Sequence, residues 1–228
     1  MILKNWEDLP RELQVDAVRP YYDILYQRRF NLCIQFIMDR ILALLLFVFL
    51  LPVFCGLAVW IKLDSKGEVF FRQERITRYG KVFRIYKFRT MVKNAEAIGS
   101  QVTTLHDRRI TKVGKMIRAC RLDELPQLIN ILQGDMGFVG TRPEVKKYVN
   151  YYTDEMKATL LLPAGVTSEA SIQFKDEDKL LQGEKDVDRV YVSKILPQKM
   201  KWNLDGLKKT SVLYNFKMMF LTVWKVGG

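Results

Sequence analysis

The chain has 228 residues, 49% of them hydrophobic, and a formal net charge of +12. This length fits one domain with an anchor, and the hydrophobic fraction excludes a disordered protein. Basic and acidic residues balance through residue 40, so the cationic excess lies in the rest of the chain, where it favours an anionic partner such as phosphates, nucleic acid or an acidic membrane surface.

The chain begins with a short amphipathic segment, residues 1–40, and continues into an uncharged apolar run, residues 41–61. The run has the roughly 20 residues that cross a bilayer core. Pro52 lies at its middle, where proline kinks or breaks a helix. Basic residues flank both ends, whereas the positive-inside rule expects one basic flank. We interpret the run as a re-entrant membrane helix that breaks at Pro52, with both ends cytoplasmic; a simple transmembrane helix is the alternative.

The rest of the chain, residues 62–228, predicts one cytoplasmic domain of α+β class that is mostly helical. Two β-rich runs, residues 68–73 and 81–89, flank a turn at Tyr79-Gly80 and predict a short β-hairpin. Helical patterns follow at residues 92–99, 111–120, 124–133, 143–160 and 211–225.

The last of these helices, residues 211–225, has one apolar face and is too short to span a bilayer. Lys217, Lys225 and Trp224 suit a helix that lies at the membrane interface, with the tryptophan near the lipid headgroups. A terminal helix that docks on the core fits the same pattern equally well.

The cysteines and the single histidine limit the kinds of metal or catalytic site that the chain can form. The three cysteines lack the spacing of metal ligands, which argues against a zinc site or a disulfide framework and for a reducing compartment. His106 is the single histidine, which argues against a site that needs two histidines or a Ser-His relay. A lone histidine is expected to be structural rather than catalytic.

Two adjacent carboxylates, Asp123 and Glu124, open the helical pattern at residues 124–133. Asp123 is a good N-cap residue, Pro126 is tolerated only in the first turn of a helix, and Gly134 is a natural end. The pair would then lie at a helix N-terminus, where free N–H groups favour anions. Taken alone, the pair also fits an ordinary capping aspartate followed by an acidic first turn.

The stretch that follows suits phosphate chemistry. Glycines in residues 134–143 permit close backbone approach to a ligand, and Arg142 and Arg118 offer guanidinium groups that match phosphate oxygens. A carboxylate such as Asp123 can attack a phosphoryl group, and a neighbouring carboxylate can hold Mg²⁺. The pattern predicts metal-assisted phosphoryl transfer. A kinase or ATPase would need a Gly-Lys-Ser/Thr phosphate loop, and the dispersed charge argues against a nucleic-acid partner.

These residues together resemble the bacterial sugar transferase family, the monotopic phosphoglycosyl transferases. The resemblance covers most of residues 38–143. The matching stretches are the apolar run with Pro52, Gln73-Glu-Arg75, residues 83–91, Arg118, residues 122–128 with Asn130, and residues 134–143.

The resemblance implies a two-step reaction at the cytoplasmic face of the bacterial inner membrane. Asp123 would attack a UDP-sugar, release UMP and carry the phosphosugar, which polyprenyl (undecaprenyl) phosphate would then accept. Glu124 would help to bind Mg²⁺, and Arg118, Arg142, Lys87 and Arg89 would bind phosphates. Membrane lipid is the expected environment, residues 62–228 would form the catalytic domain, and downstream glycosyltransferases are possible partners in glycoconjugate assembly.

The chain also departs from the family pattern. Leu51-Pro52 replaces a common Ser-Pro, Gln35-Phe36 replaces a Lys-Arg pair, and Thr141 replaces a proline. Residues 163–172 replace a frequent Pro-Gly-Ile-Thr-Gly-Trp segment, so the resemblance does not extend to sugar recognition there. Two alternatives stay open: a non-catalytic basic membrane scaffold, and transfer of a bare sugar, which would release UDP. The sugar, the lipid length, the oligomeric state and the role of residues 1–40 are not predicted.

Overall fold

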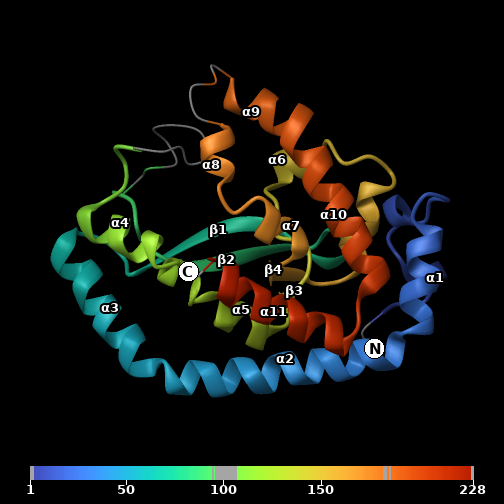
Figure 1. Ribbon diagram of the computed structural model, residues 1–228, viewed down its shortest axis with the longest axis horizontal. Coiled ribbons are helices and arrows are strands. Elements are labelled where there is room, and N and C mark those ends of the chain that lie inside the picture. The colour runs from blue at the N-terminus through green and yellow to red at the C-terminus, as the bar shows by residue number, and fades with distance from the viewer. Residues whose placement is uncertain (1–2, 94, 96–106, 182–183, 185, 227–228) are drawn as a thin grey trace.

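A long pair of helices and two small sheets frame the molecule, with further helices packed over them (Figure 1). The computed structural model describes residues 3–93, 95, 107–181, 184 and 186–226. The helices are α1 (Arg19–Gln27), α2 (Arg29–Phe49), α3 (Leu51–Asp64), α4 (Lys112–Ala119), α5 (Gln127–Gln133), α6 (Lys146–Val149), α7 (Glu169–Gln173), α8 (Glu177–Leu180), α9 (Val187–Val190), α10 (Leu196–Lys209) and α11 (Val212–Val226). The strands are β1 (Phe70–Ile76), β2 (Val82–Phe88), β3 (Met136–Val139) and β4 (Ala164–Thr167). The predicted α+β class with mostly helical content is confirmed.

The predicted hairpin is present. Strands β1 and β2 pair antiparallel, with Phe70 opposite Phe88 and Ile76 opposite Val82. The turn between them holds Tyr79 at φ 61 and Gly80 at φ 75. Gly80 adopts this left-handed conformation without a steric cost, whereas Tyr79 does not.

A second sheet, β3 with β4, is parallel and was not predicted. Its strands are four residues each, too short for an alternating pattern to show. Gly137 faces Gly165 across the pair. A Cβ on Gly165 would meet backbone atoms of Gly140, so glycine is required where the two strands approach.

The apolar run forms the second half of α2 and most of α3. The helix is interrupted at Leu50, and Pro52 occupies the first turn of α3, where its missing N–H costs nothing. Figure 1 shows α3 turning away from the line of α2 at this point. Among the described residues, α2 alone is long and apolar enough to cross a membrane by length and composition. The predicted helix break is therefore present, although α2 begins well before residue 41.

One face of this helix pair packs on the body and the other is exposed. Ala43, Phe54, Leu57 and Ile61 are buried in the main core. That core also takes residues from β2, α4, α5 and both strands of the second sheet. The exposed apolar side chains of this helix pair include Ile41, Leu44, Leu45, Val48, Phe49, Val53, Val59 and Leu63.

The N-terminal segment packs on the protein rather than standing apart. Leu9, Leu13 and Val18 are buried in one cluster with Leu161 and with residues of α10. The amphipathic pattern of residues 1–40 therefore reflects a face that covers the C-terminal half of the chain.

Several predicted helices differ from the observed ones. Residues 143–160 form only the four-residue α6 and a later 3-10 turn, because the chain leaves the helix after α6 and the Thr153 hydroxyl accepts a hydrogen bond from the Met156 N–H. Helices α4 and α11 match their predictions within three residues, while α10 was not predicted. His106 and most of the helix predicted at residues 92–99 lie outside the described residues.

Candidate active site

The two adjacent carboxylates lie on a 3-10 turn, Leu122–Glu124, between α4 and α5. Arg121, just before it, has φ 55, a left-handed conformation that costs a non-glycine residue on the order of 1 kcal/mol. The prediction that Asp123 caps the following helix is wrong. Helix α5 begins at Gln127 with no side-chain cap, because the chain first makes this separate turn.

A cavity of about 1160 Å³ brings the predicted site residues together. Its wall includes all six side chains that the sequence singled out for catalysis or phosphate binding. They are Asp123, Glu124, Arg118, Arg142, Lys87 and Arg89. They come from strand β2, helix α4, the 3-10 turn and the segment after β3, so residues 55 positions apart converge on one space.

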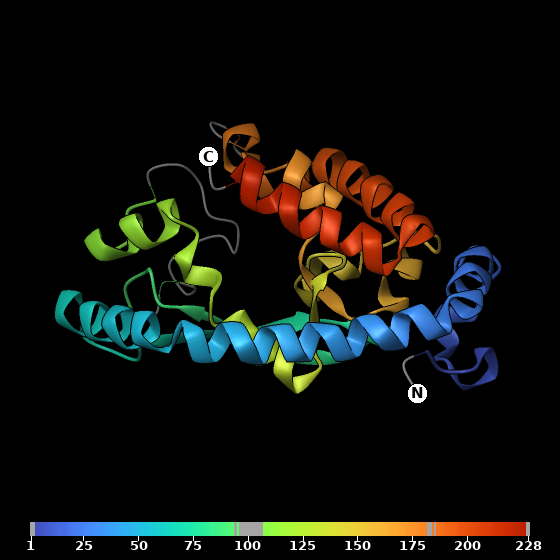
Figure 2. The ribbon, with the colours of Figure 1, turned by 60° about the horizontal axis from the view of Figure 1, so that its bottom comes forward.

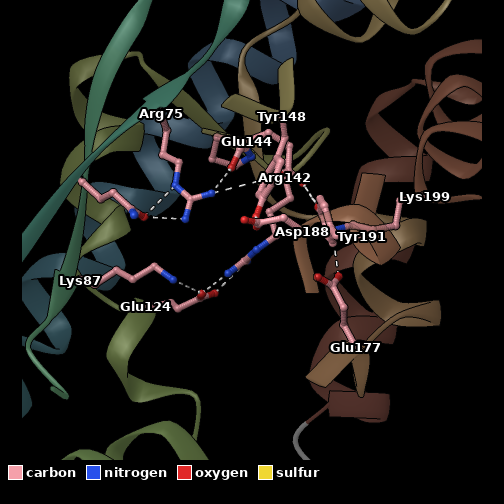
Figure 3. A network of polar contacts seen from close by, with 12 residues as sticks. Arg75, Lys87, Glu124, Arg142, Glu144, Tyr148, Glu177, Asp188, Tyr191 and Lys199 are labelled. Carbon is pink, nitrogen blue, oxygen red and sulfur yellow. Dashed lines mark hydrogen bonds and ion pairs between the residues drawn. The ribbon is translucent and has the colours of Figure 1, made fainter. Parts of the chain in front are cut away.

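Glu124 is fixed by two cations (Figure 3). The Lys87 Nζ donates to its Oε1 at 2.9 Å, and the Arg142 Nη1 donates to its Oε2 at 3.1 Å. The Arg142 Nη2 also donates to Oε1, which completes a forked pair. Burial by itself would raise the pKa of Glu124, but Arg142 and Lys87 hold that pKa well below its usual range.

Asp123 has a different environment. Within the described part of the chain, its carboxylate makes no hydrogen bond or ion pair, although it lines the same cavity. Burial raises the pKa of Asp123, Lys87 opposes that rise, and the neighbouring Glu124 adds to it. The pair therefore offers one carboxylate that is held in place and one that is open to a ligand.

Arg89 also has a structural partner. Its Nη2 donates to the carbonyl oxygens of Ser65 at 2.6 Å and Ile61 at 3.3 Å, which closes the C-terminal end of α3. Its Nε and Nη1 have no hydrogen-bond partner among the residues that the structure describes. Arg89 thus ties the α2–α3 helix pair to the end of strand β2 beside the cavity.

The glycines of residues 134–143 serve the protein's own packing. Gly134 ends α5 at φ 87, as predicted. A Cβ on Gly137 would lie 2.6 Å from the Asp39 Oδ2, and one on Gly140 would lie 2.9 Å from the Pro163 carbonyl oxygen. Their small size lets α2 and β4 approach β3, instead of admitting a ligand.

A buried polar cluster beside Arg142, which lines the same cavity, was not predicted (Figure 3). Glu144 accepts hydrogen bonds from the Tyr191 hydroxyl and from the Lys199 Nζ, the latter at 3.4 Å. Burial opposes ionisation of Glu144, yet Lys199 and Arg75 hold its pKa below the usual range. Arg75 appeared in the sequence only as part of a matching stretch, and no sequence signal marked Tyr191 or Lys199, because the elements that carry them were not predicted.

Comparison with known proteins decides the family. The model of the bacterial sugar transferase family matches residues 30–228. The chain belongs to this family. As a bacterial sugar transferase it is 35% identical over 192 residues to the UDP-glucose:undecaprenyl-phosphate glucose-1-phosphate transferase of Escherichia coli (strain K12), covering 82% of this chain and 39% of that protein.

Two other relatives are also named as undecaprenyl-phosphate sugar-phosphate transferases. The UDP-N-acetylgalactosamine-undecaprenyl-phosphate N-acetylgalactosaminephosphotransferase of Aeromonas hydrophila is 44% identical over 119 residues, which cover 52% of this chain and 28% of that protein. The UDP-glucose:undecaprenyl-phosphate glucose-1-phosphate transferase of Caulobacter vibrioides is 32% identical over 190 residues. These residues cover 82% of this chain and 67% of that protein. The chain thus spans well under half the length of the Escherichia and Aeromonas relatives.

The carboxylate pair fits part of a magnesium site. Among the described residues, no group of three acidic, histidine or cysteine side chains gathers. Mg²⁺ is commonly held by one or two carboxylates with substrate phosphates completing its shell. Counting the described residues alone, the Oε2 of Glu124 accepts a single hydrogen bond and Asp123 accepts none, so both keep lone pairs for a cation.

Proposed function

We propose that this bacterial sugar transferase transfers a sugar-1-phosphate from a UDP-sugar to undecaprenyl phosphate and releases UMP. The names of its relatives support the two substrates. The observation that carries the proposal is the contrast within the carboxylate pair. Glu124 is held by Lys87 and Arg142, while Asp123, one residue away in the same cavity, is open to a ligand.

Asp123 acts as the nucleophile of a two-step reaction. In the first step, an Asp123 carboxylate oxygen attacks the β-phosphorus of the UDP-sugar. The bond from that phosphorus to the bridging oxygen breaks, UMP leaves with the bonding electrons, and the phosphosugar remains on Asp123. In the second step, a phosphate oxygen of undecaprenyl phosphate attacks the same phosphorus and displaces the carboxylate, which gives undecaprenyl diphosphate sugar.

Cationic side chains neutralise the charge of the phosphates. Arg142, Lys87 and Arg118 line the cavity around Asp123, where fixed positive charge stabilises a developing phosphoryl transition state. Glu124 orients two of these cations through its ion pairs. Mg²⁺, held by Glu124 with donor phosphate oxygens, would add Lewis-acid stabilisation of the leaving group when bound.

The membrane arrangement suits a lipid acceptor. The cavity wall includes Leu46 and Leu50 at the helix break and Thr222 and Val223 of α11. The cavity therefore extends from Asp123 to the helices that carry the exposed apolar faces. We place α2 and α3 in the cytoplasmic leaflet as a re-entrant pair, with α11 at the interface and the cavity on the cytoplasmic side. Glycosyltransferases that extend the lipid-linked sugar would be its functional partners.

UMP release tests the proposal. Purified protein in detergent would be incubated with Mg²⁺, undecaprenyl phosphate and a panel of UDP-sugars, and UMP would be measured for wild type and Asp123→Asn. We expect UMP from one or a few donors and a loss of at least about 1000-fold in Asp123→Asn, because no nucleophile remains. Since burial raises the pKa of Asp123, the neutral asparagine should leave the melting temperature unchanged or higher.

Two results would overturn the proposal. UDP instead of UMP would show transfer of a bare sugar. No nucleotide product from any donor, with folded protein that still associates with membranes, would favour the scaffold alternative. The closed Lys87–Glu124–Arg142 arrangement argues against a scaffold, since a recruitment surface needs no buried ion pair inside a cavity.

A further inference from the structure

The segment that carries Arg142 is held at its backbone by strand β1. The Arg75 Nη1 donates to the Pro143 carbonyl oxygen at 3.2 Å, and the Ile76 N–H donates to the Glu144 carbonyl oxygen at 2.9 Å. Two consecutive carbonyls are thereby fixed just after Arg142. The guanidinium at the other end of Arg142 is fixed on Glu124.

The Glu144 side chain joins this segment to the C-terminal half of the chain. Its carboxylate accepts from Tyr191 and Lys199, and the Lys199 Nζ also donates to the Tyr191 hydroxyl at 2.9 Å and to Glu177 at 2.9 Å. Glu144 and Lys199 are 6% and 7% exposed. Ionisable side chains are almost never buried this deeply without partners, so loss of one member leaves the others buried without a partner that they need.

We propose that Glu144 is a positioning residue, through which Tyr191 and Lys199 set where the Arg142 guanidinium lies beside Glu124. Glu144 is separated from Arg142 by one rigid proline, so a displacement of its anchored carboxylate is carried to the arginine backbone. A misplacement of about 1 Å can cost about 100-fold in rate. The inference rests on the proposed function, in which Arg142 binds the donor phosphates.

A second cluster of the same chemistry provides a matched control. Asp188 accepts from the Tyr148 hydroxyl at 2.5 Å and from the Lys147 Nζ at 2.5 Å. This carboxylate joins α6 to α9 and is not part of the cavity wall. The Tyr148 ring packs against the Tyr191 ring, with 4.6 Å between the centroids, so Asp188→Asn is used because it leaves both rings in place. Loss of a carboxylate–tyrosine–lysine contact can then be compared at two places, and only Glu144 lies two residues from Arg142 in the chain.

A double-mutant cycle separates positioning from general stability. Tyr191→Phe removes one hydroxyl from Glu144 at nearly constant volume, and Glu144→Gln removes the charge. Each would be combined with Arg142→Lys, which keeps the charge but loses the fork. The controls are Asp188→Asn and melting temperatures for every variant.

We expect Tyr191→Phe and Glu144→Gln to lower kcat/KM for the UDP-sugar by about tenfold or more in the wild-type background, and by less than about twofold with Lys at position 142. Asp188→Asn should change kcat/KM by less than about twofold. Equal losses in both backgrounds would overturn the inference, as would an Asp188→Asn loss as large as that of Tyr191→Phe. If Glu144→Gln fails to fold, Tyr191→Phe alone decides.

UDP binding, measured by calorimetry on the same variants, separates this inference from the proposed function. The same non-additivity in UDP affinity, without UMP release from any donor, would keep the positioning role of Glu144 and reject the transferase. UMP release with additive losses in both measurements would keep the transferase and reject the positioning role.

Discussion

Asp123 and Glu124 are neighbours in the chain, yet their surroundings separate their properties. Arg142 and Lys87 make bonds to Glu124 and hold its pKa low, while burial raises the pKa of Asp123. Two carboxylates whose environments move their pKa values apart can take different roles in one reaction. In the proposed reaction, Glu124 keeps its charge and holds the cations, and Asp123 makes the covalent bond to the phosphosugar.

The acid limb of the pH profile should report on Asp123. The residue must be ionised to attack, and its pKa is raised, so activity should fall on acidification with a midpoint above the ordinary value of about 3.9. Lys87 lowers that pKa, so Lys87→Met should move the acid limb to higher pH as well as slow the reaction. The measurement is kcat/KM against pH for both proteins.

Lys81→Met is the control for this shift. Lys81 pairs with Asp135 at 3.0 Å, and its side chain is 68% exposed. Lys81 lies just before β2 and outside the cavity wall, so its loss should leave the acid limb in place. An acid limb that is the same in Lys87→Met and wild type would show that Asp123 is not the group that titrates.

At the scale of elements, the sequence predicted structures that form between neighbouring residues, but not the pairing of strands that lie far apart in the chain. The hairpin was predicted because alternation and a turn lie within about twenty residues, and α11 because its apolar face repeats over a single helix. The β3–β4 pair escaped prediction because its strands are short and lie in separate parts of the chain. A single run of sequence does not contain the information that pairs them.

The same difference between local and distant contacts applies to the site. The motif residues line one cavity, but the partners of Glu144 lie 47 and 55 positions away on elements that the sequence pattern did not predict. Asp123 was predicted to cap a helix because Pro126 and Gly134 do bound a helical segment. In the structure a separate 3-10 turn precedes α5. The spacing of apolar residues does not distinguish such a turn from the first turn of a helix.

The second sheet gives a prediction at this scale. Gly165→Ala would place a Cβ against the Gly140 backbone, which is part of the β3–β4 contact and cannot move as a side-chain end can. Overpacking of this kind costs about 1–3 kcal/mol, and each kcal/mol lowers the melting temperature by roughly 2–4 °C in a chain of this size. Thermal unfolding of the detergent-solubilised protein measures it.

Gly56→Ala provides the comparison. Gly56 lies in α3 with nothing within 4 Å of an added Cβ. Alanine is the better helix former by about 1 kcal/mol, so this change should leave the melting temperature unchanged or higher. Equal losses at Gly56 and Gly165 would contradict the close strand approach.

At the scale of the whole molecule, the exposed apolar surface is concentrated on one side. Helices α2, α3 and α11 run along the side that faces the viewer in Figure 2, and α11 contacts α2. The exposed side chains on α11 are Leu213, Phe216, Phe220, Val223 and Trp224. Large apolar side chains exposed along neighbouring helices are typical of a membrane or partner interface. The opposite face of α11 packs on the core through Met218 and Thr222. The two interpretations of this helix, docking on the core and lying at the membrane interface, therefore concern two different faces of it.

This arrangement predicts the depth of Trp224. Its side chain is 73% exposed near the end of α11, beside Lys225, which suits a tryptophan at headgroup level. In a variant with Trp6, Trp60 and Trp202 replaced by Phe, reconstituted in nanodiscs, lipids brominated near the headgroup should quench Trp224 fluorescence more than lipids brominated near the chain end. A variant that keeps only Trp60, in α3, is the positive control for lipid contact. Trp224 emission that no brominated lipid quenches, with Trp60 quenched, would place α11 away from the bilayer and confine membrane binding to α2 and α3.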